Sequence, residues 1–163
     1  MAPEEIWRYN QWNLTKHTNM EENMIGALIA KSKVTLSYDL LNARDIKKFL
    51  ANWHDECVWC YPGAVSVSGE FKGKTAVEEW FQNFLDHFQS IKLTPKSVCV
   101  NNMFDFVGSN IVTVNFDEEL IDNDGNKFLF EGVTVITLKF GKATHAQDFF
   151  LSTDEEMRKA WGD

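Results

Sequence analysis

The sequence TAVEEWFQNFLDHF, residues 75–88, is the strongest structural signal in the chain. Its apolar side chains recur at steps of three and four residues, the spacing of one face of an α-helix; they are Val77, Trp80, Phe81, Phe84, Leu85 and Phe88. Thr75 and Glu78 have the spacing of a capping box, which predicts where the helix begins. A stripe so rich in aromatic rings must be buried, so we expect this helix to cover the apolar face of a sheet.

Two further helices are expected upstream. Between residues 21 and 41 the apolar positions recur mostly at helical steps, which predicts a long helix. Asp45 is a candidate N-cap for a short helix, whose buried stripe is Ile46, Phe49, Leu50 and Trp53. Residues 1–20 show no periodicity and are expected to form an arm. Residues 57–61, CVWCY, predict a strand that a Pro-Gly pair ends.

After Pro95 the apolar period changes from that of a helix to that of a strand. Four segments rich in Val, Ile, Phe and Thr are separated by short turn sequences; they are residues 96–107, 110–121, 127–140 and 143–151. Links this short join antiparallel neighbours, so they predict a meander. Three helices followed by a bent antiparallel sheet indicate an α+β fold, and we expect residues 21–163 to form a single domain.

Composition argues against several classes of partner. The chain has 163 residues, with 16 Lys and Arg against 24 Asp and Glu, for a net charge of −8. Such a surface repels nucleic acid phosphates and anionic membranes, so neither is an expected partner. The N-terminal residues lack the basic start and apolar stretch of a signal peptide. Three cysteines cannot all pair with one another, and we expect a cytoplasmic protein.

The cysteine motif Cys57-x-x-Cys60 invites a redox or metal-binding interpretation. Residues three apart in a strand point to opposite faces, whereas redox motifs of this spacing open a helix. His54 would add a third metal ligand, but strand geometry separates it from the thiols. We therefore expect two structural thiols, with no metal and no cofactor.

Two acids are candidates for chemistry. If positions 112, 114 and 116 face the helices, alternation turns Asp117 outward; in the opposite register it lies inside a pocket. Asp148 precedes two phenylalanines near the end of the last predicted strand. Burial there would raise its pKa toward that of a general acid or base, whereas an edge position would leave it in solvent. The residues alone leave both questions open.

Several local strings resemble those of a known superfamily. They are WHDECVW (residues 53–59) leading to Pro62-Gly63, GEFKG (residues 69–73) before the capped helix, and Gly141-Lys142 before Gln147-Asp148-Phe149-Phe150. With the order of elements over residues 24–151, they resemble the nuclear transport factor 2-like (NTF2-like) superfamily. Within it, the nearest branch is that of SnoaL-like cyclases, ketosteroid isomerases and limonene epoxide hydrolases. The resemblance implies a cone-shaped sheet curved around three helices, an apolar pocket open at one end, and a homodimer formed through the outer sheet face.

The resemblance also assigns roles to individual residues. Asp148 matches the last-strand acid that acts as base in the cyclases and as one acid of the epoxide hydrolases. Asp117 matches the second hydrolase acid, and Asn115 stands where those enzymes have an arginine. Tyr61 occupies the position of the isomerases' base, and Tyr38 lies beside that of their oxyanion tyrosine.

Three more residues, His54, Trp59 and His145, are expected as pocket wall or relay groups. Two hypotheses follow from the whole set. The first is a cofactor-free isomerase, cyclase or epoxide hydrolase that uses a pocket carboxylate on a small hydrophobic molecule. The second is a ligand-binding or dimerisation module of the same fold with no chemistry.

Overall fold

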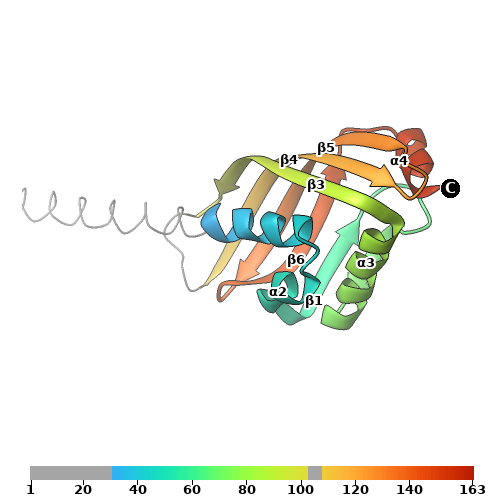
Figure 1. Ribbon diagram of the computed structural model, residues 1–163. Coiled ribbons are helices and arrows are strands. Elements are labelled where there is room, and N and C mark those ends of the chain that lie inside the picture. The colour runs from blue at the N-terminus through green and yellow to red at the C-terminus, as the bar shows by residue number, and fades with distance from the viewer. Residues whose placement is uncertain (1–30, 103–107) are drawn as a thin grey trace, which may run out of the picture.

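The computed structural model describes residues 31–102 and 108–163 and has the expected α+β architecture. A six-stranded sheet curves around a layer of helices (Figure 1). Its strands are β1 (Trp53–Tyr61), β2 (Gly69–Lys72), β3 (Phe88–Val100), β4 (Ser109–Asp122), β5 (Lys127–Lys139) and β6 (Lys142–Phe150). The helices are residues 31–42, α2 (Ile46–Ala51), α3 (Lys74–His87) and α4 (Asp154–Trp161).

The predicted meander is confirmed for β3 to β6, but the sheet as a whole is mixed. Its strand order is β2-β1-β6-β5-β4-β3, and β1 pairs in parallel with β6. All other pairs are antiparallel. The expectation of a wholly antiparallel sheet is wrong at this one pair, because short turns fix the direction of sequential neighbours only. After β1 and its neighbour β2, the chain crosses through α3 to β3 at the opposite edge of the sheet. The meander from β3 to β6 then returns to the side of β1.

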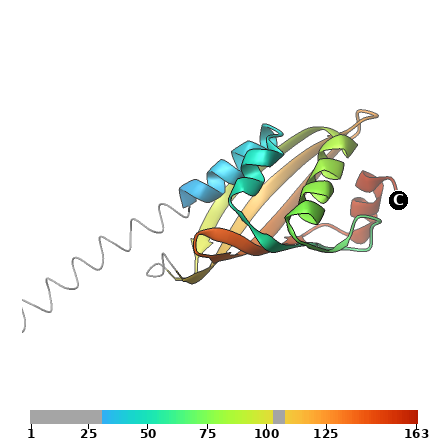
Figure 2. The same ribbon diagram turned by 90° about the horizontal axis from the view of Figure 1, so that it is seen from below.

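The aromatic stripe of α3 is buried as predicted. The helix itself lies on the concave side of the sheet (Figure 2). The start of α3 differs from the prediction. It begins at Lys74 after Gly73, whose φ of 83° suits glycine, so Thr75 lies inside the first turn and makes no cap. The stripe's last member, Phe88, is buried as the first residue of β3.

Capping boxes do occur elsewhere. Thr153 and Glu156 form one at the start of α4, a helix that the sequence analysis missed. Asp45 caps α2 as predicted and accepts a hydrogen bond from the Lys48 backbone N–H at 3.1 Å. The hairpin turn expected at residues 122–126 is confirmed, since Asp122 accepts from backbone amides within it.

The packing of the Phe116 ring requires a glycine at the facing position of β5. Gly132 pairs with Phe116, and a Cβ at this position would lie 2.7 Å from Phe116 Cζ. Only a residue without a side chain leaves room for that fully packed ring on the concave side.

Two expectations from the sequence concern the N-terminal part of the chain. The arm at residues 1–20 and the first half of the helix expected from residue 21 lie outside the described residues. Residues 31–42 confirm the second half of that helix. No helix among the described residues is long and apolar enough to cross a membrane.

Candidate functional site

A cavity of about 110 Å³ lies between the concave face of the sheet and the helices. Its wall is largely aromatic, with Phe49, Trp53, Trp59, Tyr61, Trp80 and Phe81 among the lining residues. These rings pack on one another, as shown by centroid distances of 5.0 Å from Trp59 to Phe81 and 5.3 Å from Trp59 to Trp80. The exposed lining residues Lys33, Asn52 and Gly141 mark its opening.

Two carboxyl groups face this apolar cavity. Glu118 comes from β4 and Asp148 from β6, and their side chains point inward because each alternates with outward-facing neighbours. They are only 5% and 8% exposed. Among the described lining residues the only cation is Lys33, at the opening. The two acids are therefore held in a desolvated site, and no cation of the described residues lies beside them.

This environment favours the neutral forms of both acids. Burial raises the pKa of Asp148 to about 7, and the hydrogen bond from Thr134 opposes that rise. Burial raises the pKa of Glu118 to about 8, with a further contribution from the charge of Asp148. Near neutral pH, Asp148 is thus poised to accept a proton while Glu118 still carries one.

A chain of hydrogen bonds links Asp148, through Thr134, to Tyr38 in the helix of residues 31–42. The Thr134 hydroxyl, on β5, donates to Asp148 Oδ1 at 2.5 Å. Tyr38 Oη lies 3.1 Å from Thr134 Oγ1. Register explains the first contact, since Thr134 and Asp148 are cross-strand partners. Burial and nearby acids raise the pKa of Tyr38, so it remains a neutral phenol.

Other polar atoms of the cavity differ in how they are satisfied. Tyr61 Oη accepts a hydrogen bond of 3.0 Å from Trp161 Nε1, which ties α4 to the pocket wall. In contrast, Glu118 Oε2 and Trp59 Nε1 are buried and have no hydrogen-bond partner within residues 31–102 and 108–163. A buried polar atom of this kind is costly unless a ligand or water completes it.

Four of the predicted site residues meet in this cavity. They are Tyr38, Trp59, Tyr61 and Asp148. Asp117 does not reach it. Because positions 112, 114 and 116 are buried, the strand turns Asp117 to the outer face, where its carboxylate lies 2.5 Å from Lys96 Nζ. The prediction of a pocket role for Asp117 is therefore wrong.

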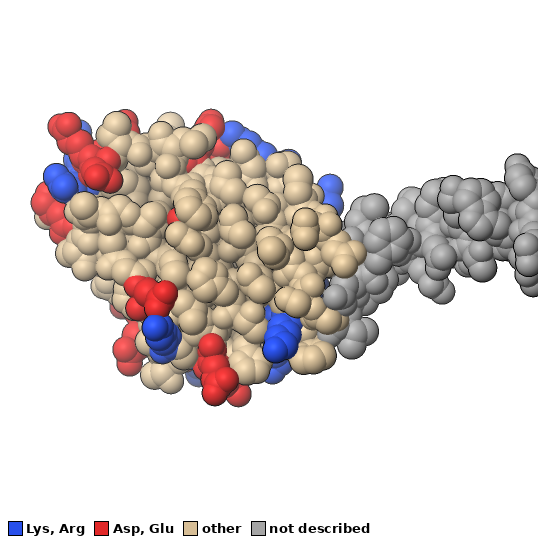
Figure 3. All heavy atoms as spheres, turned by 180° about the vertical axis from the view of Figure 1, so that it is seen from behind, with Lys and Arg blue, Asp and Glu red and all other residues tan. Residues whose placement is uncertain are grey.

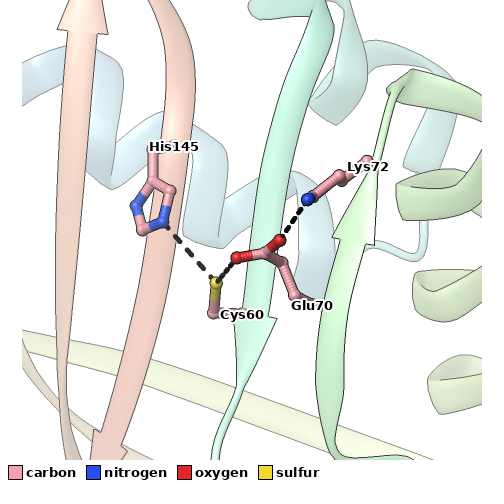
Figure 4. A network of polar contacts seen from close by, with 4 residues as sticks. All are labelled: Cys60, Glu70, Lys72 and His145. Carbon is pink, nitrogen blue, oxygen red and sulfur yellow. Dashed lines mark hydrogen bonds and ion pairs between the residues drawn. The ribbon is translucent and has the colours of Figure 1, made fainter.

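Three other predicted site residues also lie outside the cavity, again because of strand alternation. His54 is exposed, and its Nδ1 accepts from the Glu56 backbone N–H. Asn115 shares the outer face with Asp117. His145 also lies there, with Nε2 3.5 Å from Cys60 Sγ (Figure 4).

The two cysteines of the C-x-x-C motif separate as predicted. Cys57 is fully buried under the sheet, whereas Cys60 lies on the outer face beside Glu70 and Lys72 (Figure 4). Desolvation raises the pKa of both thiols, which argues against reactive thiolates. No group of three or more metal-ligating side chains occurs among the described residues.

Sequence reasoning missed Glu118 and Thr134. A signal for Glu118 was present, because it shares the face of the buried positions 112, 114 and 116. Thr134 gave no such signal, since a hydroxyl in a strand of Val and Ile is common on either face. As built, the site can exchange protons with a small apolar molecule: one acid accepts, the other donates, and aromatic walls exclude water.

Solved structures with the same fold support this architecture. Bal32a, from a soil-derived mobile gene cassette, has 16% sequence identity and a TM-score of 0.68, covering 86% of this chain and 97% of its own. An NTF2-like protein of unknown function from Burkholderia pseudomallei has 19% identity and a TM-score of 0.66, covering 85% and 96%. TerC, co-crystallised with polyporic acid, has 18% identity and a TM-score of 0.63, covering 81% and 97%. At such identities the likeness concerns the fold alone.

No curated protein matches the sequence. The family model of the SnoaL-like domain, in contrast, matches residues 34–146, which include most of the elements that line the cavity but end before Asp148. This chain belongs to the SnoaL-like domain family and has the fold of NTF2-like proteins.

Proposed function

We propose that this protein is a cofactor-free acid–base enzyme that moves a proton on a small, uncharged, hydrophobic substrate. The observation that carries the proposal is the pair of buried carboxyl groups, Asp148 and Glu118, in an aromatic cavity with its one described cation at the opening. An anionic substrate would place a second negative charge beside ionised Asp148, so a neutral one is favoured.

The two acids would have different roles. Ionised Asp148 is the base, taking a proton from a carbon next to a carbonyl group. Glu118, still protonated at neutral pH because burial raises its pKa to about 8, is the acid that donates to the substrate oxygen. Isomerases and cyclases use this type of step.

Epoxide hydrolysis is less well supported than isomerisation or cyclisation. The acids of such a hydrolase need a charged group to hold one of them ionised beside the other. Neither Arg44 nor Arg158, the arginines among the described residues, lines the cavity. Asp117, the predicted second acid, is on the outer face.

The experiment measures proton abstraction directly and needs no known product. A panel of small cyclic and aromatic ketones is incubated with the protein in D₂O, and loss of the α-proton signal is followed by NMR. A thermal-shift screen of the same compounds, with polyporic acid added because TerC was crystallised with it, reports binding separately.

Asp148→Asn is the test variant and Asp117→Asn the matched control on the outer face. We expect Asp148→Asn to fold, to bind, and to lose exchange activity by about 100-fold or more. Asp117→Asn should retain full activity. Binding without any exchange in the wild type would support the ligand-binding module instead. Unchanged exchange in Asp148→Asn would refute the assignment of Asp148 as the base.

Two further parts of the proposal concern partners and location. A second copy of the chain is proposed to cover the outer sheet face, whose centre carries few charges (Figure 3). Exposed apolar side chains on this face include Ile111, Leu129 and Phe149. We also propose a cytoplasmic location, which is compatible with three unpaired cysteines.

A further inference from the structure

Tyr38, Thr134 and Asp148 form a chain of hydrogen bonds. Which hydroxyl donates and which accepts in this chain depends on whether Asp148 is ionised. Tyr38, Thr134 and Asp148 are each less than 9% exposed and come from three different elements. The distances are 3.1 Å from Tyr38 Oη to Thr134 Oγ1 and 2.5 Å from Thr134 Oγ1 to Asp148 Oδ1. A threonine hydroxyl has one hydrogen, so Thr134 can donate to only one of its two neighbours at a time.

The charge of Asp148 decides which neighbour receives that hydrogen. An ionised carboxylate only accepts, and its hydrogen bonds are stronger than those between neutral groups. Thr134 then donates to Asp148, and Tyr38 must donate to Thr134. In this state the phenol hydrogen of Tyr38 is engaged, and Tyr38 offers the cavity only an acceptor.

We propose that Thr134 is a positioning residue that turns the Tyr38 hydroxyl toward the substrate when Asp148 takes up a proton. Once Asp148 is neutral, its hold on the Thr134 hydrogen weakens, and Thr134 can donate to Tyr38 Oη instead. The phenol hydrogen of Tyr38 is then free to point into the cavity, which Tyr38 lines. This inference rests on the role proposed above for Asp148 as the base.

The reorientation of the Tyr38 hydroxyl would coincide with the step in which negative charge develops on the substrate oxygen. When Asp148 abstracts a proton, the substrate C–H bond breaks and an O–H bond forms on the carboxyl group. The electron pair left on carbon moves onto the carbonyl oxygen of the substrate. Rotation of the Thr134 and Tyr38 hydroxyls then presents a new donor to that oxygen, without transfer of any further proton.

Among the described residues, few other titratable groups surround the hydrogen bonds of Tyr38, Thr134 and Asp148. Glu118 on β4 and Tyr61 on β1 face the same cavity, and Lys33 lies at its opening. The cavity side of α3 contributes Trp80, Phe81 and Phe84, which do not titrate. The charge of Asp148 also acts through space on Tyr61, whose hydroxyl is bonded to Trp161 and not to Thr134. Tyr61 therefore serves as an internal control.

The test is an NMR pH titration of protein labelled at tyrosine ¹³Cζ and at the aspartate carboxyl carbon. Tyr38→Phe and Tyr61→Phe assign the tyrosine signals, and Asp148→Asn assigns the carboxyl signal. We expect the Tyr38 signal to shift with the same midpoint as the Asp148 carboxyl, and by at least twice as much as the Tyr61 signal. Thr134→Ser, which keeps the hydroxyl, should behave like the wild type.

Thr134→Val removes the hydroxyl while keeping the shape of the side chain. In this variant Asp148 should still titrate, at a higher pH, but the excess shift of Tyr38 over Tyr61 should disappear. A Tyr38 shift no larger than that of Tyr61 in the wild type would overturn the inference, as would an undiminished shift in Thr134→Val. Failure of ketone exchange would count against the proposed function alone, because this titration needs no substrate.

Discussion

The buried acid pair predicts that the protein becomes less stable as the pH rises from 5 to 8. Burial raises the pKa of Asp148 from 3.8 to about 7 and that of Glu118 from 4.5 to about 8. Between these limits the native protein binds more protons than the unfolded chain. The free energy of unfolding therefore falls with rising pH across this window.

The size of the effect follows from proton linkage. Integrated between pH 5 and 8, each of the two acids lowers the free energy of unfolding by about 3 kcal/mol, or about 6 kcal/mol together. That is a large part of the 5–15 kcal/mol typical of a domain. The exposed acids with lowered pKa values, such as Asp45 and Glu156, ionise below this window and do not obscure it.

Two variants separate the contributions. Glu118→Gln should remove about half of the pH dependence, because Asp148 titrates first, while Glu118 is still neutral. Asp148→Asn should remove more than half, since the charge of Asp148 also raises the pKa of Glu118. The double variant should be nearly independent of pH.

The assay is urea denaturation followed by tryptophan fluorescence at pH 5, 6, 7 and 8, with Asp117→Asn as the control on the outer face. That control should retain the wild-type slope because its carboxylate is exposed and paired with Lys96. A wild-type protein as stable at pH 8 as at pH 5 would refute the reasoning, and equal slopes in all variants would do the same.

Three further predictions concern the framework around the site. Gly132→Ala should lower the free energy of unfolding by about 1–3 kcal/mol, because its Cβ would collide with the packed Phe116 ring; Phe116→Leu in the same chain should recover part of the loss in urea denaturation. Thr153→Ala should cost about 1 kcal/mol by removing the α4 cap, whereas Thr75→Ala should have a smaller effect, and equal losses would contradict the assignment of the cap. If a second copy covers the outer face, light scattering should give twice the monomer mass for the wild type and the monomer mass for Phe149→Lys.

Much of the fold could be predicted because it follows from local patterns. The period-2 segments after Pro95 and their short turns fix which strands are neighbours, and the stripe of α3 shows what covers them. The parallel contact of β1 with β6 could not be predicted in this way, since it joins strands far apart in the chain. The true start of α3 depends on the backbone of Gly73, which a Thr-x-x-Glu spacing does not reveal.

The candidate site could be predicted only in part for a similar reason. The resemblance identified Asp148 by its position in the last strand, but the partner acid depends on which face of β4 is buried. Because adjacent residues of a strand point to opposite faces, the choice of buried face decides whether Glu118 or Asp117 lies in the cavity. Thr134 could be identified as a site residue only from the strand register, which places it opposite Asp148.

The parallel pairing of β1 with β6 also has a consequence for how the protein is made. Trp59 on β1 lies opposite Ala146 on β6, so one seam of the cavity joins two strands that are far apart in the sequence. Contacts of such long range form slowly. During synthesis this seam cannot close until β6 has left the ribosome. Until then the aromatic side chains of β1 lack their partner strand, and exposed apolar surface of this kind favours aggregation.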